Sequence, residues 1–134
     1  MKVLVTGAEG FIGSNLCQYL AERENVETLC FTRDNSSTIL PDMLQTVDLV
    51  YHCAGINRPK SNEEFVTGNI ELTNALCEAV SSVSSSVGKK IPIVYTSSIH
   101  AVNDSPYGNS KQIAEEHLFQ LQNKHEIPVY VFRL

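Results

Sequence analysis

A tyrosine and a lysine stand four residues apart at Tyr107 and Lys111, directly after the dipeptide Ser105-Pro106. Serine is a favoured helix N-cap and proline is favoured at the first helical position, so we expect a helix to begin here. Side chains four residues apart lie on one face of a helix. An ammonium group beside a phenol favours the phenolate, so the pair could pass a proton to or from a substrate oxygen. The alternative is an accidental surface pair.

Polar side chains are expected near this pair. Ser97-Ser98 ends an apolar run that predicts a strand. A hydroxyl at that point, that of Ser98 above all, could donate to a substrate carbonyl and polarise it, or it could simply close a turn. Asn69 stands at the start of a predicted helix, where it could contact substrate or water or equally cap the helix.

A glycine-rich loop, Gly7-Ala8-Glu9-Gly10-Phe11-Ile12-Gly13, follows the first predicted strand and opens the first predicted helix. Gly7 would permit the tight turn, Gly10 the approach of backbone to a pyrophosphate, and Gly13 close packing of helix and strand. The helix would point its N–H groups and its dipole at the phosphates. In this context the loop predicts dinucleotide binding, with an ordinary turn as the alternative. The spacing is not that of a P-loop.

The residues after the second predicted strand bear on the choice between NADP and NAD. The chain reads Thr32-Arg33-Asp34, with Ser36 and Ser37 close behind. An arginine here accommodates a 2′-phosphate, whereas an acidic residue holds the free 2′-hydroxyl. We therefore expect Arg33 and Thr32 to bind NADP. In the alternative, Arg33 is a solvated charge, Asp34 binds the ribose, and the cofactor is NAD.

Strands and helices alternate along the whole chain. Short apolar, β-branched runs predict five strands: Lys2–Thr6, Val26–Thr32, Asp48–Ala54, Ile91–Ser97 and Val129–Arg133. Helical periodicity covers Phe11–Glu24, a short turn at Pro41–Val47, a long helix from Thr67 and a helix from Pro106 to Lys124, with Ser81–Gly88 as a serine-rich exit. This alternation predicts right-handed crossovers and a doubly wound parallel α/β sheet, a Rossmann fold.

Composition limits the other possibilities. The 134 residues suit one domain, and ten basic against fifteen acidic residues give a net charge of -5, which disfavours nucleic acid and anionic membranes as partners. No apolar run is long enough to span a bilayer, and no signal peptide opens the sequence. The cysteines at 17, 30, 53 and 77 form no C-x-x-C pair and are expected to be buried thiols in a reducing compartment. A metal site using His52 and Cys53 is disfavoured, because adjacent strand residues point to opposite faces.

Taken together, these motifs resemble the extended short-chain dehydrogenase/reductase family, which comprises nucleotide-sugar epimerases, dehydratases and reductases. The matching segments are Thr6-Gly7-x-x-Gly10-Phe11-Ile12-Gly13, His52-x-Ala54-Gly55, Asn69, Thr96-Ser97-Ser98 and Tyr107-Gly108-x-Ser110-Lys111. The resemblance implies a catalytic triad of Ser98, Tyr107 and Lys111. It implies cofactor contacts from Gly7, Glu9, Gly10, Phe11, Ile12, Gly13, Thr32, Arg33, Cys53, Ala54, Gly55, Thr96, Tyr107 and Lys111.

A narrower resemblance rests on Ala54–Pro59, Gly68-Asn69 and the segment from Ser97 to Gly108. These look like capsular-polysaccharide reductases that act on a UDP-linked N-acetylated 4-keto-6-deoxy sugar. The resemblance implies hydride transfer from NADPH to C4, a proton from Tyr107, and substrate contacts from Arg58, Asn69 and Ser98. The modest acidity and the free cysteines suit a cytoplasmic enzyme, and the wider family resemblance implies a dimer formed through the helix that carries Tyr107 and the long middle helix.

Three departures from the family pattern carry further expectations. Only a short segment separates the second strand from Asp48, so the sheet is expected to lack one edge strand. The segment from Ser98 to Tyr107 is short, which suits reductases better than epimerases. Ile99-His100 stands where dehydratases place an acidic pair, which makes dehydration the least expected chemistry.

Two alternatives stay open beside the reductase: a sugar epimerase with tightly held NAD, and a non-catalytic dinucleotide-binding module. We also expect the 134 residues to be the cofactor-binding part of a longer enzyme, truncated before its substrate-binding region, with most of the sugar pocket outside this chain and little activity on its own.

Overall fold

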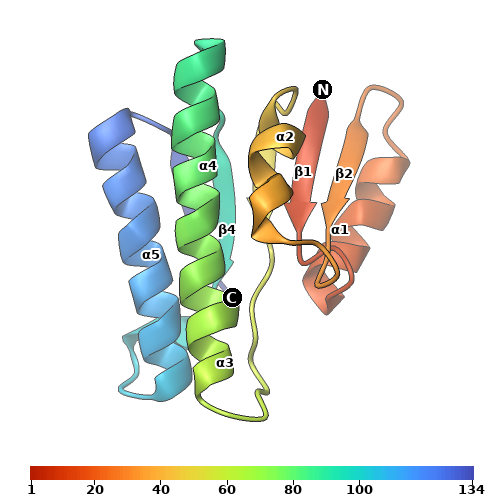
Figure 1. Ribbon diagram of the computed structural model, residues 1–134. Coiled ribbons are helices and arrows are strands. Elements are labelled where there is room, and N and C mark those ends of the chain that lie inside the picture. The colour runs from red at the N-terminus through yellow and green to blue at the C-terminus, as the bar shows by residue number, and fades with distance from the viewer.

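Five parallel strands form the sheet in the order β2-β1-β3-β4-β5 in the computed structural model, which describes residues 1–134 (Figure 1). Their bounds are β1 Lys2–Thr6, β2 Glu27–Phe31, β3 Leu49–His52, β4 Ile93–Ser97 and β5 Val129–Arg133. The predicted doubly wound sheet is confirmed, and the chain between β2 and β3 adds no further strand. The strand order reverses between β1 and β3, and a crevice forms at the carboxyl ends of strands at such a point.

Helices cover both faces of this sheet. They are α1 Phe11–Ala21, α2 Leu40–Leu44, α3 Glu63–Phe65, α4 Leu72–Val87 and α5 Pro106–His125, with shorter turns η1 Ser37–Ile39, η2 Val66–Glu71 and η3 Ile99–Val102. Figure 1 shows α4 and α5 side by side on one face with α2 beside them, and α1 on the other side of β1 and β2. Eighteen buried residues form the core under α2, α4 and α5, whereas a cluster of four lies under α1.

The face that carries α1 is only partly covered. Tyr130 and Phe132 of β5 are 55% and 54% exposed, and Tyr130 is in register with Val94 of β4. Both faces of parallel sheets are ordinarily covered. The β4–β5 part of this face is therefore an apolar surface without a helix of residues 1–134 over it.

Several element boundaries differ from the sequence prediction. Strands β2, β3 and β4 are two or three residues shorter than predicted, and the short helix predicted at Pro41–Val47 is α2, Leu40–Leu44. Helix α1 ends at Ala21 rather than Glu24. The serine-rich stretch predicted as an exit is helical to Val87, and Gly88 then ends the helix at φ 67°. Buried Val80 and Val83 hold these turns on the core, while the Ser85 and Ser86 hydroxyls donate to carbonyls of the same helix. The middle helix also begins earlier than Thr67, because α3 runs directly into the π-helical turn η2.

The prediction that all four cysteines are buried is wrong. Only Cys77 is buried, Cys17 and Cys53 are partly exposed, and Cys30 is exposed. The reason is that β2 is an edge strand, so α1 shields Cys30 on one side only. The Cys17 and Cys30 sulfurs lie 3.8 Å apart across that contact.

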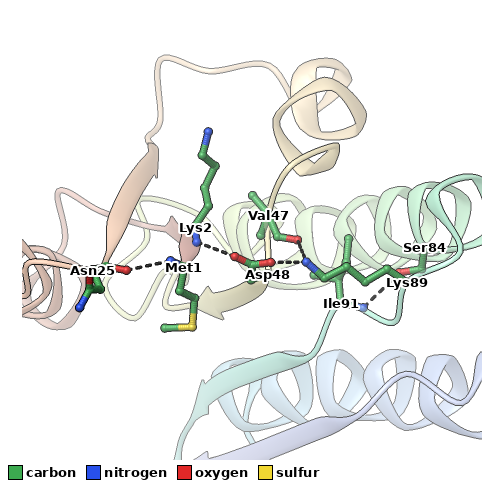
Figure 2. A network of polar contacts seen from close by, with 8 residues as sticks. All are labelled: Met1, Lys2, Asn25, Val47, Asp48, Ser84, Lys89 and Ile91. Atoms are coloured by element: carbon green, nitrogen blue, oxygen red, sulfur yellow. Dashed lines mark hydrogen bonds and ion pairs between the residues drawn. The ribbon is translucent and has the colours of Figure 1, made fainter.

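Polar contacts connect the amino ends of β1 and β3 with the segment after α4, at the edge of the sheet opposite the crevice (Figure 2). Asp48, just before β3, accepts a hydrogen bond of 2.7 Å from the Lys2 backbone N–H and pairs with the Lys89 ammonium group. The Lys89 hydrogen bond, followed by that from Lys2, lowers the pKa of the Asp48 carboxyl below its ordinary value of 3.8. One carboxylate thus joins β1, β3 and the segment after α4.

Replacing Asp48 with asparagine should lower the melting temperature at neutral pH, because the Lys89 ion pair is lost. The depressed pKa means that this stabilisation is present above pH 3.8 and is lost as the pH falls through the native-state value. Thermal unfolding of D48N and the wild type should therefore converge in acid. Glu27→Gln is the control on the same edge, since Glu27 makes one exposed ion pair with Lys2 and such pairs contribute little. An equal effect of both variants at neutral pH would contradict this role of Asp48.

Candidate active site

The glycine loop makes a close backbone crossing at the carboxyl end of β1. Gly7 has φ 68°, and a Cβ there would lie 2.6 Å from backbone atoms of Ala54. A Cβ on Gly13 would lie 2.1 Å from the Gly7 carbonyl oxygen. Gly10 is the N-cap residue of helix α1 and supplies no side-chain cap, so the first N–H groups of the helix are available to an anion. The loop therefore has the shape and the donors that a pyrophosphate needs.

A cleft of about 950 Å³ runs along this edge of the sheet. Many predicted cofactor and substrate residues line it: Gly7, Glu9, Gly10, Thr32, Arg33, Cys53, Ala54, Gly55 and Arg58. Its lining also includes residues that the sequence did not single out, among them Asn35, Lys60 and Glu64. The predicted residues Phe11, Ile12, Gly13, Asn69, Thr96, Ser98, Tyr107 and Lys111 do not line the cleft itself, and Phe11 is 87% exposed.

The loop after β2 is shaped by an asparagine. The Asn35 side-chain oxygen accepts hydrogen bonds from the Thr32 backbone N–H at 2.8 Å and from its hydroxyl at 3.3 Å. The loop presents Arg33 to the cleft, whereas Asp34 is not part of the cleft wall. Of the two charged residues of this loop, the cleft wall therefore contains the guanidinium group of Arg33 and not the carboxylate of Asp34.

Lys111 is buried next to the end of β4. Its ammonium group donates to the Thr96 carbonyl at 3.2 Å and lies 4.9 Å from the centre of the Tyr95 ring. Burial lowers the pKa of Lys111 to about 8. A Cβ on Gly55 would lie only 2.9 Å from the Lys111 nitrogen, so the glycine keeps space for the ammonium group.

Tyr107 lies in the first turn of α5, which Ser105 caps as predicted by accepting from the Gly108 N–H at 3.0 Å. The Tyr107 ring is half-buried between aromatic side chains, with ring centres 5.8 Å from Phe65 and 6.4 Å from His100. Ser98 begins the η3 turn, and its oxygen accepts from the His100 N–H at 3.2 Å. The Ser98 hydroxyl proton is thus left to donate to a ligand.

Asn69 is almost fully buried within the π-helical turn η2, so the alternative that it caps the start of a helix is wrong. Its side-chain oxygen accepts from the Ile56 N–H at 2.7 Å. Its amide donates to the Ile56 carbonyl at 3.1 Å and to the Ser110 hydroxyl at 2.9 Å. Both N–H groups are therefore used within the protein, and a direct substrate contact stays a prediction.

An ion pair that sequence reasoning missed ties α5 to the ends of β4 and β5. Glu115 accepts from Arg133 at 3.0 and 2.7 Å and from the Ser97 hydroxyl at 2.5 Å. Burial by itself would raise the pKa of Glu115, but the bonds from Arg133 and Ser97 outweigh it and lower the pKa. The spacing of Glu115, one helical turn beyond Lys111, was the signal available in the sequence.

Two further observations bear on the kind of site. His52, considered above as a metal ligand, has both ring nitrogens within hydrogen-bond distance of threonine hydroxyls. Neither nitrogen is therefore available to an ion.

None of the helices combines the length and the apolar character that crossing a bilayer would demand.

Residues 3–134 match the NAD dependent epimerase/dehydratase family. The chain belongs to this family. A reductase of Pseudomonas aeruginosa, UDP-2-acetamido-2,6-beta-L-arabino-hexul-4-ose reductase, is 55% identical over all 134 residues. The chain spans 35% of that protein's length.

Solved structures of the family have the same fold. The UDP-glucuronic acid 4-epimerase of Bacillus cereus in complex with NAD superimposes with a TM-score of 0.85 at 25% identity, covering 99% of this chain and 56% of the epimerase. The capsular polysaccharide assembling protein CapF of Staphylococcus aureus gives a TM-score of 0.75 at 31% identity, covering 99% of this chain and 35% of CapF. The family resemblance read from the sequence is confirmed.

The buried ammonium group of Lys111 should titrate with a midpoint near pH 8 rather than at the ordinary 10.5. Between about pH 8 and pH 10.5 the native state binds fewer protons than the unfolded chain. In this range the lysine therefore makes the protein more stable as the pH rises. NMR titration of labelled lysine side chains measures the midpoint, and Lys111→Met identifies the signal by removing it. A midpoint near 10.5 would contradict the burial of the ammonium group.

Proposed function

We propose that the chain is the cofactor-binding and catalytic part of an NADP-dependent reductase that acts on a nucleotide-linked 4-keto sugar. The observation that carries this proposal is the position of Lys111, which donates to the Thr96 carbonyl of β4 and lies against Gly55 of the cleft wall. Ser98 directly follows β4, and Tyr107 lies one helical turn before Lys111 in α5. Support also comes from the 55% identity to a UDP-sugar 4-keto reductase. The match to CapF supports a role in capsule or surface polysaccharide synthesis.

The proposed roles follow from chemistry that each group can perform. When bound, the nicotinamide cofactor supplies the hydride that reduces the ketone carbon. The Ser98 hydroxyl donates to the ketone oxygen, and Tyr107 gives its phenolic proton to the same oxygen as the alcohol forms. Lys111 stabilises the phenolate left behind. Arg58 lies on the cleft wall, where its guanidinium group suits an anionic part of the substrate.

The choice of NADP rests on the cleft wall after β2. Arg33 lines the cleft, Thr32 and Ser37 are close to it in the chain, and Asp34 is not on the wall. A guanidinium group pairs well with a phosphate, and no carboxylate from this loop is placed to repel one.

Exchanging Arg33 for aspartate should reverse the cofactor preference. We expect NADPH affinity to fall by about tenfold or more, equivalent to about 1.4 kcal/mol, while NADH binding is kept or improved. Fluorescence titration of both nucleotides measures the ratio. Arg23→Asp, an equal charge change on the exposed turn after α1, is the control and should leave the ratio unaltered. A ratio that does not move in R33D would remove Arg33 from the cofactor site.

An epimerase with bound NAD is the second candidate, because the epimerase structure that superimposes at a TM-score of 0.85 is an NAD complex. The short segment between Ser98 and Tyr107 favours the reductase. A non-catalytic dinucleotide-binding module is disfavoured, because such a module needs no proton relay.

The reductase proposal is tested by turnover. In the intact protein that carries this chain, a UDP-linked 2-acetamido 4-keto-6-deoxy sugar should be consumed together with an equal amount of NADPH. Tyr107→Phe should lower kcat by about 100-fold or more with NADPH affinity unchanged, since only the transferable proton is lost. Tyr19→Phe, at an exposed tyrosine of α1, is the control. Interconversion of 4-epimers without net NADPH oxidation would instead establish the epimerase.

We further propose that sugar recognition depends largely on segments that correspond to the remaining length of the relatives. Support comes from the coverage of only 35% to 56% of those proteins and from the exposed Tyr130 and Phe132 on the β4–β5 face.

The proposal also includes a cytoplasmic location, because the four free thiols suit a reducing compartment. Dimerisation through α4 and α5 remains part of this proposal.

A further inference from the structure

His52 is a fully buried histidine in the last position of β3, and the proposed mechanism does not use it. Its Nδ1 lies 2.7 Å from the Thr6 hydroxyl oxygen and its Nε2 lies 2.8 Å from the Thr73 hydroxyl oxygen. Its ring stacks on Tyr95 with centres 5.1 Å apart. The histidine therefore joins β1, β3 and α4 directly beneath the cleft.

The directions of these hydrogen bonds follow from the groups at the two ends. The Thr73 oxygen lies 2.6 Å from the Asn69 carbonyl oxygen, and because a carbonyl has no proton, Thr73 must donate there. Thr73 can then only accept from His52, so the histidine carries its proton on Nε2. A neutral imidazole has one N–H, so Nδ1 accepts from the Thr6 hydroxyl.

The chain of hydrogen bonds continues past both threonines. The Thr6 oxygen also accepts from the Ala54 N–H at 3.2 Å, which fixes the turn where β3 leads into the cleft wall. At the other end lies Asn69, whose side chain holds Ile56 and, through Ser110, the first turn of α5. Ser110 in turn donates to the Tyr107 carbonyl at 2.7 Å. Hydrogen bonds of His52, Thr73 and Asn69 therefore connect Thr6, next to the glycine loop, with the first turn of α5, which carries Tyr107.

The surroundings of His52 keep it neutral. The groups that face it are the Tyr95 ring from β4, the two threonine hydroxyls and, further away, the Lys111 ammonium group of α5, with no carboxylate among them. Burial and then the charge of Lys111 lower the pKa of His52 to about 3. Its hydrogen-bond directions are therefore constant across the range in which an enzyme works.

The hydrogen bonds of His52 matter for ligand binding because the residues that they hold lie in or next to the cleft wall. Thr6 adjoins Gly7, while Ala54, Gly55 and Ile56 line the cleft. Asn69 lies in the π-helical turn η2, and such turns occur frequently at functional sites because they displace the backbone from regular helix. Its own carbonyl is anchored by Thr73, and Thr73 is held by His52.

We propose that His52 is a positioning residue, which as the neutral Nε2–H tautomer fixes the cofactor-cleft backbone and Asn69 in one arrangement through Thr6 and Thr73. This inference rests on the proposed cofactor function for its binding consequence only. The hydrogen-bond directions are a property of the fold and can be tested without a ligand.

The first test is binding of NADPH by variants at Thr73. Thr73→Val removes the partner of Nε2–H and should weaken NADPH binding by about tenfold, because the buried donor is left unpaired and the cleft wall shifts. Thr73→Ser keeps the hydroxyl and should bind within about twofold of the wild type. Val80→Ala, a cavity variant further along α4, controls for lost stability and should lower the melting temperature without changing the affinity. Equal weakening in V80A and T73V, or no rescue in T73S, would overturn the positioning role.

The second test needs no cofactor. Long-range ¹⁵N–¹H NMR of labelled histidine should show a proton on Nε2 of His52 and none on Nδ1 from pH 8 to pH 5. In T73V the side-chain amide of Asn69 should exchange its protons with water faster, whereas in T73S it should not. An Nδ1–H tautomer, or an Asn69 amide unchanged in T73V, would refute the inference. If these signatures are found and the wild type binds neither NADPH nor NADH, the proposed function fails while the assignment of His52 stands.

Discussion

Four polar side chains are buried near the carboxyl ends of β3 and β4, and their need for partners determines how the helices pack there. Lys111, His52, Asn69 and Glu115 are each at most 5% exposed. A buried polar group without a partner costs on the order of 1–3 kcal/mol, and a charge costs more. Each of the four therefore requires partners on another element. These hydrogen bonds restrict the position of α4 and α5 on the sheet more than apolar packing alone would. The reason is that a hydrogen bond tolerates a smaller displacement than a contact between methyl groups does.

The four groups meet the requirement in different ways. Glu115 stays ionised because Arg133 supplies two hydrogen bonds. His52 is neutral and uses its two nitrogens as one donor and one acceptor. Lys111 has only the Thr96 carbonyl and the face of Tyr95, and this incomplete solvation is what lowers its pKa to about 8. The lowered pKa of Lys111 is therefore a direct consequence of burying an ammonium group that has few partners.

The cleft combines rigid and open parts. The wall made by the glycine loop and Ala54-Gly55 is fixed by backbone contacts so close that no Cβ fits at Gly7. Arg33 and Arg58 are exposed and reach the cleft from loops. This division suits a ligand whose pyrophosphate binds to backbone and whose distinguishing groups bind to side chains. The proposed choice between NADP and NAD depends on the exposed part, so it can change by substitution without disturbing the fold.

Local sequence patterns were enough to predict the five strands to within a few residues, the glycine loop and the start of α5 at Ser105-Pro106. These features depend on apolar runs, on glycine conformations and on capping, all of which are local. It also placed Tyr107 and Lys111 on one helix. It did not reveal that the serine-rich segment of α4 is helical, because burial of Val80 and Val83 on the sheet outweighs the weak helix preference of serine. The partners of His52, Asn69 and Glu115 lie up to 46 residues away in the chain and are known only from the folded structure. No local pattern encodes such a pairing, because it arises only when the parallel strands bring their carboxyl ends to one edge.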